Sequence, residues 1–114
     1  MITFACKKIK QEELIRCSFN LNKTEYNVFM FMLKRNQPYT VSRIAKIMRL
    51  ERTTVQKAVK NLFNKKLIKR IQRNLPRGGY IFIYEINNKD EIKDKMKKIV
   101  YEWYKSVEAA IDKI

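Results

Sequence analysis

The chain has 114 residues, enough for one domain with a packed core but too few for two comfortable ones. Its hydrophobic fraction of 46% argues against wholesale disorder. Its formal net charge of +15, from 26 Lys and Arg against 11 Asp and Glu, predicts a polyanionic partner.

The positive charge is concentrated in the middle of the chain. Residues 40–80 contain twelve basic residues and a single acid, Glu51. Residues 89–114, in contrast, contain seven Lys and six acids. A chain that is basic only for solubility would spread its charge more evenly, so this distribution predicts a local surface for nucleic acid.

The sequence lacks the residues and motifs that several classes of enzyme and ligand-binding protein use. There is no His, no Gly-rich phosphate-binding loop, no nucleophile elbow and no clustered pair of carboxylates. We therefore expect no enzyme, no cofactor and no metal ion. The longest apolar run, residues 28–33, is far below the roughly 20 residues that cross a bilayer, so we expect a cytoplasmic protein.

Cys6 and Cys17 are the two cysteines of the chain. They do not form the dense framework of a small secreted fold, and they cannot complete a four-ligand zinc site unless a dimer contributes both pairs. A redox switch or an intersubunit disulfide is one interpretation. We expect the commoner one, in which both are small buried apolar side chains.

The N-terminal segment, residues 1–20, has weak signals, although residues 7–17 could form a short helix. A clear helix start follows, because Asn22 can act as N-cap and Glu25 completes a capping box. We expect this helix to end at residues 37–38. Its predicted buried stripe is Tyr26, Phe29, Met30 and Leu33.

Two short amphipathic helices follow, separated by a tight turn at residues 49–51. Thr40 is the predicted cap of the first, and Tyr39 is placed to pack on Ile44 across that cap. The predicted buried faces are Val41, Ile44, Ala45 and Met48 in the first helix, and Val55, Ala58, Val59, Leu62 and Phe63 in the second. Two short helices that are joined by a tight turn and preceded by another helix predict a helix-turn-helix.

A basic hairpin comes next, with strands at residues 68–73 and 80–86 around a turn at 74–79. A hairpin directly after a helix-turn-helix is typical of a wing. Tyr80, Phe82 and Tyr84 share one strand face, and we expect them to pack in the core.

One long helix without Gly or Pro is predicted from residue 88 or 89 to the end. Its apolar seam of about 28 Å is longer than a small winged domain can cover, which favours a homodimer over a helix that folds back on its own domain. Trp103 and Tyr104 would be natural anchors of that contact. The predicted interface residues are Ile92, Met96, Ile99, Val100, Trp103, Val107, Ala110 and Ile114, with Ile111 broadening the seam.

The fold class expected is mainly α with a small β-hairpin (α+β), a winged helix-turn-helix with a long C-terminal dimerisation helix. We expect residues 1–20 to be an N-terminal segment, residues 21–88 to be a DNA-binding domain and residues 89–114 to be a dimerisation helix.

The residues predicted to bind DNA are hydrogen-bonding or basic, and they suit base edges and phosphates. They are Thr40, Ser42 and Arg43 at one helix start, Arg52, Thr53, Thr54, Gln56, Lys57, Lys60 and Asn61 on the third helix, and Arg70, Arg73, Arg77 and Gly78 in the wing. The alternatives are a solvated helix face, a Gly-Gly pair that only closes the hairpin, and arginines that protect an exposed strand edge.

The sequence resembles the MarR/TrmB-like winged helix-turn-helix transcriptional regulators, in particular their small single-domain archaeal members. The likeness is carried by residues 21–26 (LNKTEY), 41–45 (VSRIA), 52–62 (RTTVQKAVKNL), 65–70 (KKLIKR) and 77–84 (RGGYIFIY). It implies a homodimer on double-stranded DNA, with the third helix (about 52–65) in the major groove and the wing (about 70–80) beside it.

The sequence departs from the family pattern at two positions. Glu51 stands where these proteins usually have a Ser or Thr cap, so the third helix could start later, with Thr53 as its cap. Lys66 stands at a helix end where the family usually has Gly, and it must adopt the helix-ending conformation at some cost. The large effector domain of the sugar-binding members is not in this sequence, so the resemblance implies no sugar ligand.

Two functional hypotheses follow. The first is a sequence-specific transcriptional regulator. The alternative is a winged-helix module that binds nucleic acid without sequence preference or docks on a protein.

Overall fold

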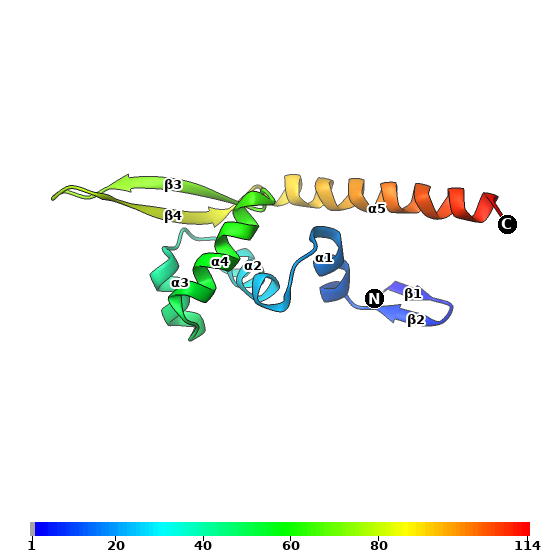
Figure 1. The fold of residues 1–114 in the computed structure, drawn as a ribbon, viewed down its shortest axis with the longest axis horizontal. Coiled ribbons are helices and arrows are strands. Elements are labelled where there is room, and N and C mark those ends of the chain that lie inside the picture. Colours follow the sequence, from blue (N-terminus) through cyan, green and yellow to red (C-terminus); the bar gives the residue numbers. More distant parts are fainter. Residues whose placement is uncertain (1) are drawn as a thin grey trace. The chain divides into compact units, whose positions relative to one another are not determined.

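Five helices and two antiparallel hairpins make up residues 2–114, the part of the chain that the computed structural model describes (Figure 1). They divide into two units. The helix-turn-helix unit, residues 22–87, contains α2 (Lys23–Arg35), α3 (Val41–Met48), α4 (Arg52–Asn64), β3 (Ile68–Asn74) and β4 (Tyr80–Ile86). The terminal unit contains β1 (Ile2–Phe4), β2 (Lys7–Ile9), α1 (Gln11–Phe19) and α5 (Lys89–Asp112). The predicted α+β winged helix-turn-helix is confirmed.

Helix α2 begins with the predicted capping box. The Asn22 side chain accepts a hydrogen bond from the Glu25 amide at 2.8 Å, and the Glu25 carboxylate accepts one from the Asn22 amide at 3.0 Å. The predicted buried stripe was wrong except for Phe29, because the helix buries Glu25, Val28, Phe29 and Met32 instead. Both stripes have the spacing i, i+3, i+4, i+7, so periodicity could not choose between them. The helix ends at Arg35, before the predicted residues 37–38, with Asn36 in the left-handed conformation.

Helices α3 and α4 form the helix-turn-helix. Thr40 caps α3 as predicted, since its hydroxyl accepts from the Arg43 amide at 3.2 Å. Arg49 then ends α3 with φ 57°, and α4 begins at Arg52 with no side-chain hydrogen bond from its N-cap, Glu51. The later start capped by Thr53 was therefore wrong.

The core of the helix-turn-helix unit joins α2, α3, α4 and the base of the β3–β4 hairpin. Its largest fully buried side chains are Val28, Phe29, Met32, Ile44, Val55, Val59, Leu62, Leu67 and Ile68. Most of the predicted faces of α3 and α4 are buried, whereas Met48 and Phe63 are half-buried. Burial of such side chains contributes about 1.5–3 kcal/mol each, which holds α4 against the other two helices.

The end of α4 has the expected strain at Lys66. The φ of Lys66 is 61°. The Lys66 amide donates a hydrogen bond to the carbonyl of Phe63 at 3.0 Å, and the Leu67 amide donates one to the carbonyl of Leu62 at 3.1 Å. These two bonds define a Schellman motif, whose left-handed position favours Gly. The left-handed conformation costs a residue with a Cβ about 1–2 kcal/mol.

We predict that Lys66→Gly raises the free energy of unfolding by about 0.5–1 kcal/mol, because relief of the strain exceeds the entropy that Gly adds to the unfolded chain. Urea denaturation measures the change. Lys65→Gly is the control, since it removes the same charge at a residue with φ −86° and should destabilise the protein. Equal effects of the two substitutions would contradict the strain at Lys66.

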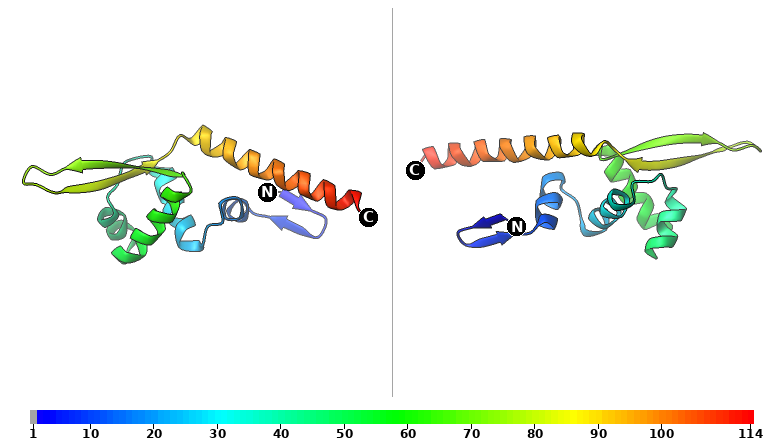
Figure 2. Two further views of the ribbon diagram at one scale, coloured as in Figure 1. Left: turned by 45° about the horizontal axis from the view of Figure 1, so that its top comes forward. Right: turned by 180° about the vertical axis from the view of Figure 1, so that it is seen from behind.

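Strands β3 and β4 form the wing, with pairing that runs from Ile68 opposite Ile86 to Asn74 opposite Tyr80. The hairpin reaches past α3 in both views of Figure 2. Gly78 and Gly79 have φ 94° and 79°, which explains the Gly-Gly pair at the turn. At its base, Tyr39 and Tyr84 exchange two backbone hydrogen bonds of 2.8 Å, so the segment before α3 pairs with the wing sheet.

The predicted core packing of the wing aromatics holds only for Tyr84, which is 4% exposed. Tyr80 is 56% exposed and Phe82 is half-buried. The physical reason is the length of the hairpin, because its outer half extends beyond the helices that could cover it (Figure 2).

The terminal unit contains a hairpin that we did not predict. Strands β1 and β2 pair from Ile2 opposite Ile9 to Phe4 opposite Lys7, and only then does α1 begin, so the helix predicted over residues 7–17 was placed too early. No Gly or Pro marks the turn of this hairpin. Cys6 and Cys17 are both exposed, which corrects their expected burial.

Helix α1 packs against α5 within this unit. The cap of α5 is Asn88, whose side chain accepts from the amides of Asp90 and Glu91. Across residues 2–114, no helix combines the length and the apolar character needed to cross a membrane.

Candidate nucleic-acid interface

The outer face of α4 carries the largest group of predicted DNA-binding residues. Val55, Val59 and Leu62 are fully buried, and they orient the helix so that the opposite side faces solvent. At 100° per residue, the exposed side chains on that opposite side form one stripe. They are Arg52, Thr53, Gln56, Lys57 and Lys60.

Asn64 belongs to the same stripe and was missed by the sequence analysis. It is exposed, and it lies four residues after Lys60 and seven after Lys57. This helical spacing could have identified it.

Asn61 and Thr54 lie at the edge of α4 that faces α2. The Asn61 side-chain amide donates to the carboxylate of Glu25, which is only 4% exposed. Thr54 is half-buried and lines a polar hollow of about 230 Å³ with Asn61, Lys57 and the first turn of α2. One amide hydrogen of Asn61 is thus engaged inside the protein, and this structural contact is one that the sequence analysis did not anticipate.

Thr40, Ser42 and Arg43 lie together at the start of α3. Thr40 is half-buried and occupied as a cap, whereas Ser42 and Arg43 are exposed. The Arg43 guanidinium lies 5.9 Å from the centre of the Tyr39 ring. A helix N-terminus with an adjacent Arg has free amides and positive charge, which suit a phosphate oxygen.

The three wing arginines are all exposed, and they differ in their contacts. Arg70 lies at the base of the hairpin, with its guanidinium carbon 4.7 Å from the ring centre of Phe63 and 4.3 Å from that of Phe82. Arg73 and Arg77 are exposed in the outer half of the hairpin, where Gly78 forms part of the turn. No acid of the described chain forms an ion pair with Arg73 or Arg77.

The charge of these surfaces is almost unopposed. The single acid between residues 40 and 80 is Glu51, and it lies next to the exposed stripe at the start of α4. A face with several Lys and Arg and one acid attracts phosphate and suits the backbone of a nucleic acid. Within residues 2–114, no group of three or more His, Cys, Asp and Glu is placed to hold a metal ion.

The predicted dimerisation helix exposes most of its apolar seam. Ile92 is buried, Met96 and Val107 are half-buried, and Trp103 is 63% exposed. The other exposed members of the predicted interface are Ile99, Val100, Ala110 and Ile114.

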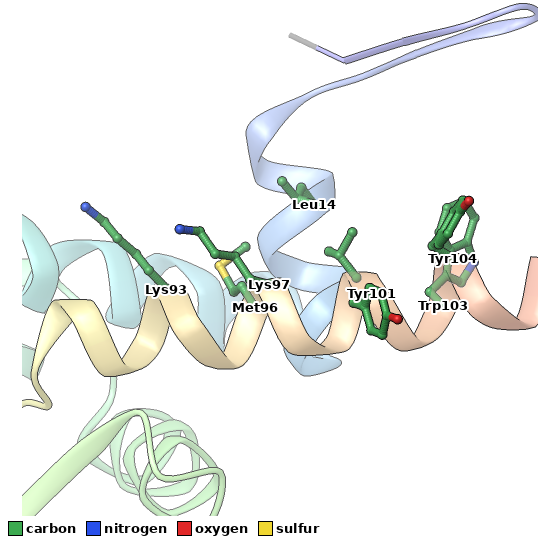
Figure 3. Close-up of a pocket in the computed structure, with 8 residues that line it drawn as sticks. Leu14, Lys93, Met96, Lys97, Tyr101, Trp103 and Tyr104 are labelled. Atoms are coloured by element: carbon green, nitrogen blue, oxygen red, sulfur yellow. The ribbon is translucent and has the colours of Figure 1, made fainter.

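A groove of about 660 Å³ runs along this face within the terminal unit. Leu14 of α1 lines it together with residues of α5 (Figure 3). Those residues of α5 are Lys93, Met96, Lys97, Val100, Tyr101, Trp103 and Tyr104. Exposed apolar and aromatic side chains that are gathered on one helix face are a common feature of protein–protein contacts.

Comparison with known sequences adds an independent observation. A model of the family described as "Sugar-specific transcriptional regulator TrmB" matches residues 15–105. An uncharacterised protein of Methanocaldococcus jannaschii is 34% identical over 103 residues, which are 90% of this chain and 77% of that protein. A second uncharacterised protein of the same organism is 35% identical over 101 residues, which are 89% of this chain and 82% of that one.

Three solved structures resemble this chain in fold, and the first of them also resembles it in sequence. A possible transcriptional regulator from Methanosarcina mazei Go1 is 36% identical, with a TM-score of 0.92 over 99% of this chain and 95% of its own. A Sulfolobus tokodaii protein has a TM-score of 0.71 at 21% identity, covering 85% of this chain and 94% of its own. A transcriptional regulator homologue from Pyrococcus horikoshii OT3 has a TM-score of 0.55 at 20% identity, covering 90% and 96%. The last two likenesses concern the fold alone.

Proposed function

The chain belongs to the TrmB family of winged helix-turn-helix transcriptional regulators, and we propose that it binds specific sites on double-stranded DNA as a homodimer. Residues 21–88 are the DNA-binding domain and residues 89–114 the dimerisation helix. We place α4, the recognition helix, in the major groove, and the wing beside it on the minor groove and its phosphates.

The exposed stripe of α4 is the observation that carries this proposal. It combines amide, hydroxyl and basic side chains on a helix whose other face is anchored in the core. Gln can form paired hydrogen bonds with adenine, and Arg or Lys with guanine, so the stripe has the chemistry of base recognition in addition to charge. A merely solvated helix face of this length would ordinarily include acids.

The homodimer is supported by the exposed seam of α5. Trp and Tyr are common anchors of interfaces, and Trp103 and Tyr104 are more than half exposed in the single chain. The charges of residues 89–114 nearly balance, so two copies of α5 can approach without the repulsion that the basic centre of the chain would cause. Two recognition helices related by a two-fold axis would read half-sites about one DNA turn apart.

Selection from a pool of random duplex DNA at two salt concentrations tests the proposal. We expect a palindromic motif, which would also identify the site. Steeply salt-dependent binding that selects no motif would replace specific regulation by an architectural role. No binding even at low salt would overturn both DNA roles and direct the search to protein partners.

Gln56 tests whether the stripe reads bases. We predict that Gln56→Ala lowers affinity for the selected site by about 1–2 kcal/mol and relaxes the preference at one base position, because a base contact is lost and the phosphate contacts remain. Binding to a panel of single-base variants of the site measures this. Gln11→Ala is the control, since Gln11 is exposed on α1 of the other unit. A uniform loss over all sequences would contradict base reading by Gln56.

A further inference from the structure

We propose that Arg70 is a positioning residue, which fixes the wing relative to the recognition helix and does not contact DNA itself. This inference rests on the function proposed above. It also assigns Arg70 a role different from that of the two other wing arginines, Arg73 and Arg77.

The geometry around Arg70 joins three elements. Arg70 belongs to β3, Phe63 to the last turn of α4 and Phe82 to β4. The guanidinium carbon is 4.7 Å from the ring centre of Phe63 and 4.3 Å from that of Phe82, and both distances are well within the range of about 6 Å for cation–π contacts. The ring of Phe82 in turn lies 5.2 Å from that of Tyr80, which extends the contact toward the turn.

The strand register explains why these side chains meet. Arg70 pairs with Tyr84, and Gln72 pairs with Phe82, so Arg70 and Phe82 are diagonal neighbours on the same face of the hairpin. Phe63 is half-buried at the end of α4, where it meets this face. Arg73 is three residues further along β3, opposite Ile81, and has no aromatic contact within residues 2–114.

The chemistry of the guanidinium suits this task. Its plane stacks on aromatic rings and is more weakly hydrated than an ammonium group, so Lys is a poor substitute at a stacked site. A two-stranded hairpin is marginally stable by itself. The contacts of Arg70 therefore tie the wing to α4, whose orientation the core already determines.

Four variants separate positioning from phosphate contact: Arg70→Lys, Arg70→Gln, Arg73→Lys and Arg73→Gln. Their affinity for the selected duplex is measured by fluorescence anisotropy at several salt concentrations. We expect both Arg70 variants to bind about five-fold more weakly than the wild type, with an unchanged salt dependence, because Lys keeps the charge but not the stacking. Arg73→Gln should instead reduce the slope of log K against log salt by about 0.9, and Arg73→Lys should keep most of the affinity.

Amide hydrogen exchange without DNA provides a second readout. We expect the amides of β3 and β4 to exchange about ten-fold faster in both Arg70 variants than in the wild type or the Arg73 variants. A phosphate contact would replace the inference if two results came together. These are that Arg70→Lys binds like the wild type and that Arg70→Gln lowers the slope of log K against log salt. If the wild type selects no site, the proposed function fails. Hydrogen exchange still decides on Arg70 in that case, since equal protection in all four variants would overturn its positioning role.

Discussion

Val100→Glu is expected to abolish the proposed homodimer and to lower the affinity for a palindromic site at least about 100-fold. Val100 lines the groove on α5 and lies at the centre of the apolar seam, so a partner helix that packed there would remove the new carboxylate from water, which is costly in an apolar contact. A monomer also loses the second half-site, and the gain from linked binding is commonly 10²–10⁴-fold. Light scattering after size exclusion measures the mass, and anisotropy measures DNA binding.

The matched control is Lys98→Gln, which changes the net charge by the same amount. Lys98 is exposed and lies about 160° around α5 from Val100, on the side away from the seam. It should leave the dimer intact, and circular dichroism should confirm that both variants remain helical. A Val100→Glu protein with the mass of a dimer would show that the seam of α5 is not the interface.

Glu25→Ala is expected to lower the free energy of unfolding by about 2–3 kcal/mol. Glu25 is 4% exposed, and its carboxylate accepts hydrogen bonds from the Asn22 amide at 3.0 Å and from the Asn61 side chain. Removal of the carboxylate disrupts the capping box, which costs about 1 kcal/mol. It also breaks the hydrogen bond from Asn61 to a charged acceptor, which costs about 1–2 kcal/mol, since Asn61 is exposed and its amide can bond to water instead. Urea denaturation followed by circular dichroism measures the change.

Glu91→Ala is a close control for this prediction. Glu91 also stands three residues after an Asn N-cap, but it is exposed, and the cap of α5 has no reciprocal bond. Its replacement should cost about 0.5 kcal/mol or less. In a double-mutant cycle, Glu25→Ala and Asn61→Ala should show a coupling of about 1 kcal/mol. Equal costs for the two Glu substitutions, or no coupling, would refute the proposed link between α2 and α4.

The helix-turn-helix was predictable because its signals are local. The Asn22–Glu25 box and the Thr40 cap involve side chains and amides three residues apart, so sequence alone could identify both helix starts. The buried faces of α3 and α4 are likewise determined within each helix by spacing. The need for a left-handed conformation at Lys66 is also local, because it follows from the helix end directly before β3.

The predictions that failed depend on surfaces far apart in the sequence. The packing of α4 and β4 on α2 decided which stripe of α2 is buried, and the alternative stripe had equal spacing. The N-terminal hairpin has no turn signal, and its exposed Ile2 and Phe4 give no clear alternation of buried and exposed positions. Tyr80 carries a core-forming side chain, but its burial depended on how far the hairpin extends.

For the candidate interface, the sequence by itself determined the basic segment, the polar stripe of α4, the wing and the seam of α5, because charge and helical period are properties of neighbouring residues. Only the tertiary structure decided which members of these sets have other partners. It linked Asn61 to Glu25 over 36 positions of the chain, and it placed Arg70 against Phe63 and Phe82. Such contacts form between elements that meet only after the core has packed, so no local pattern in the sequence encodes them.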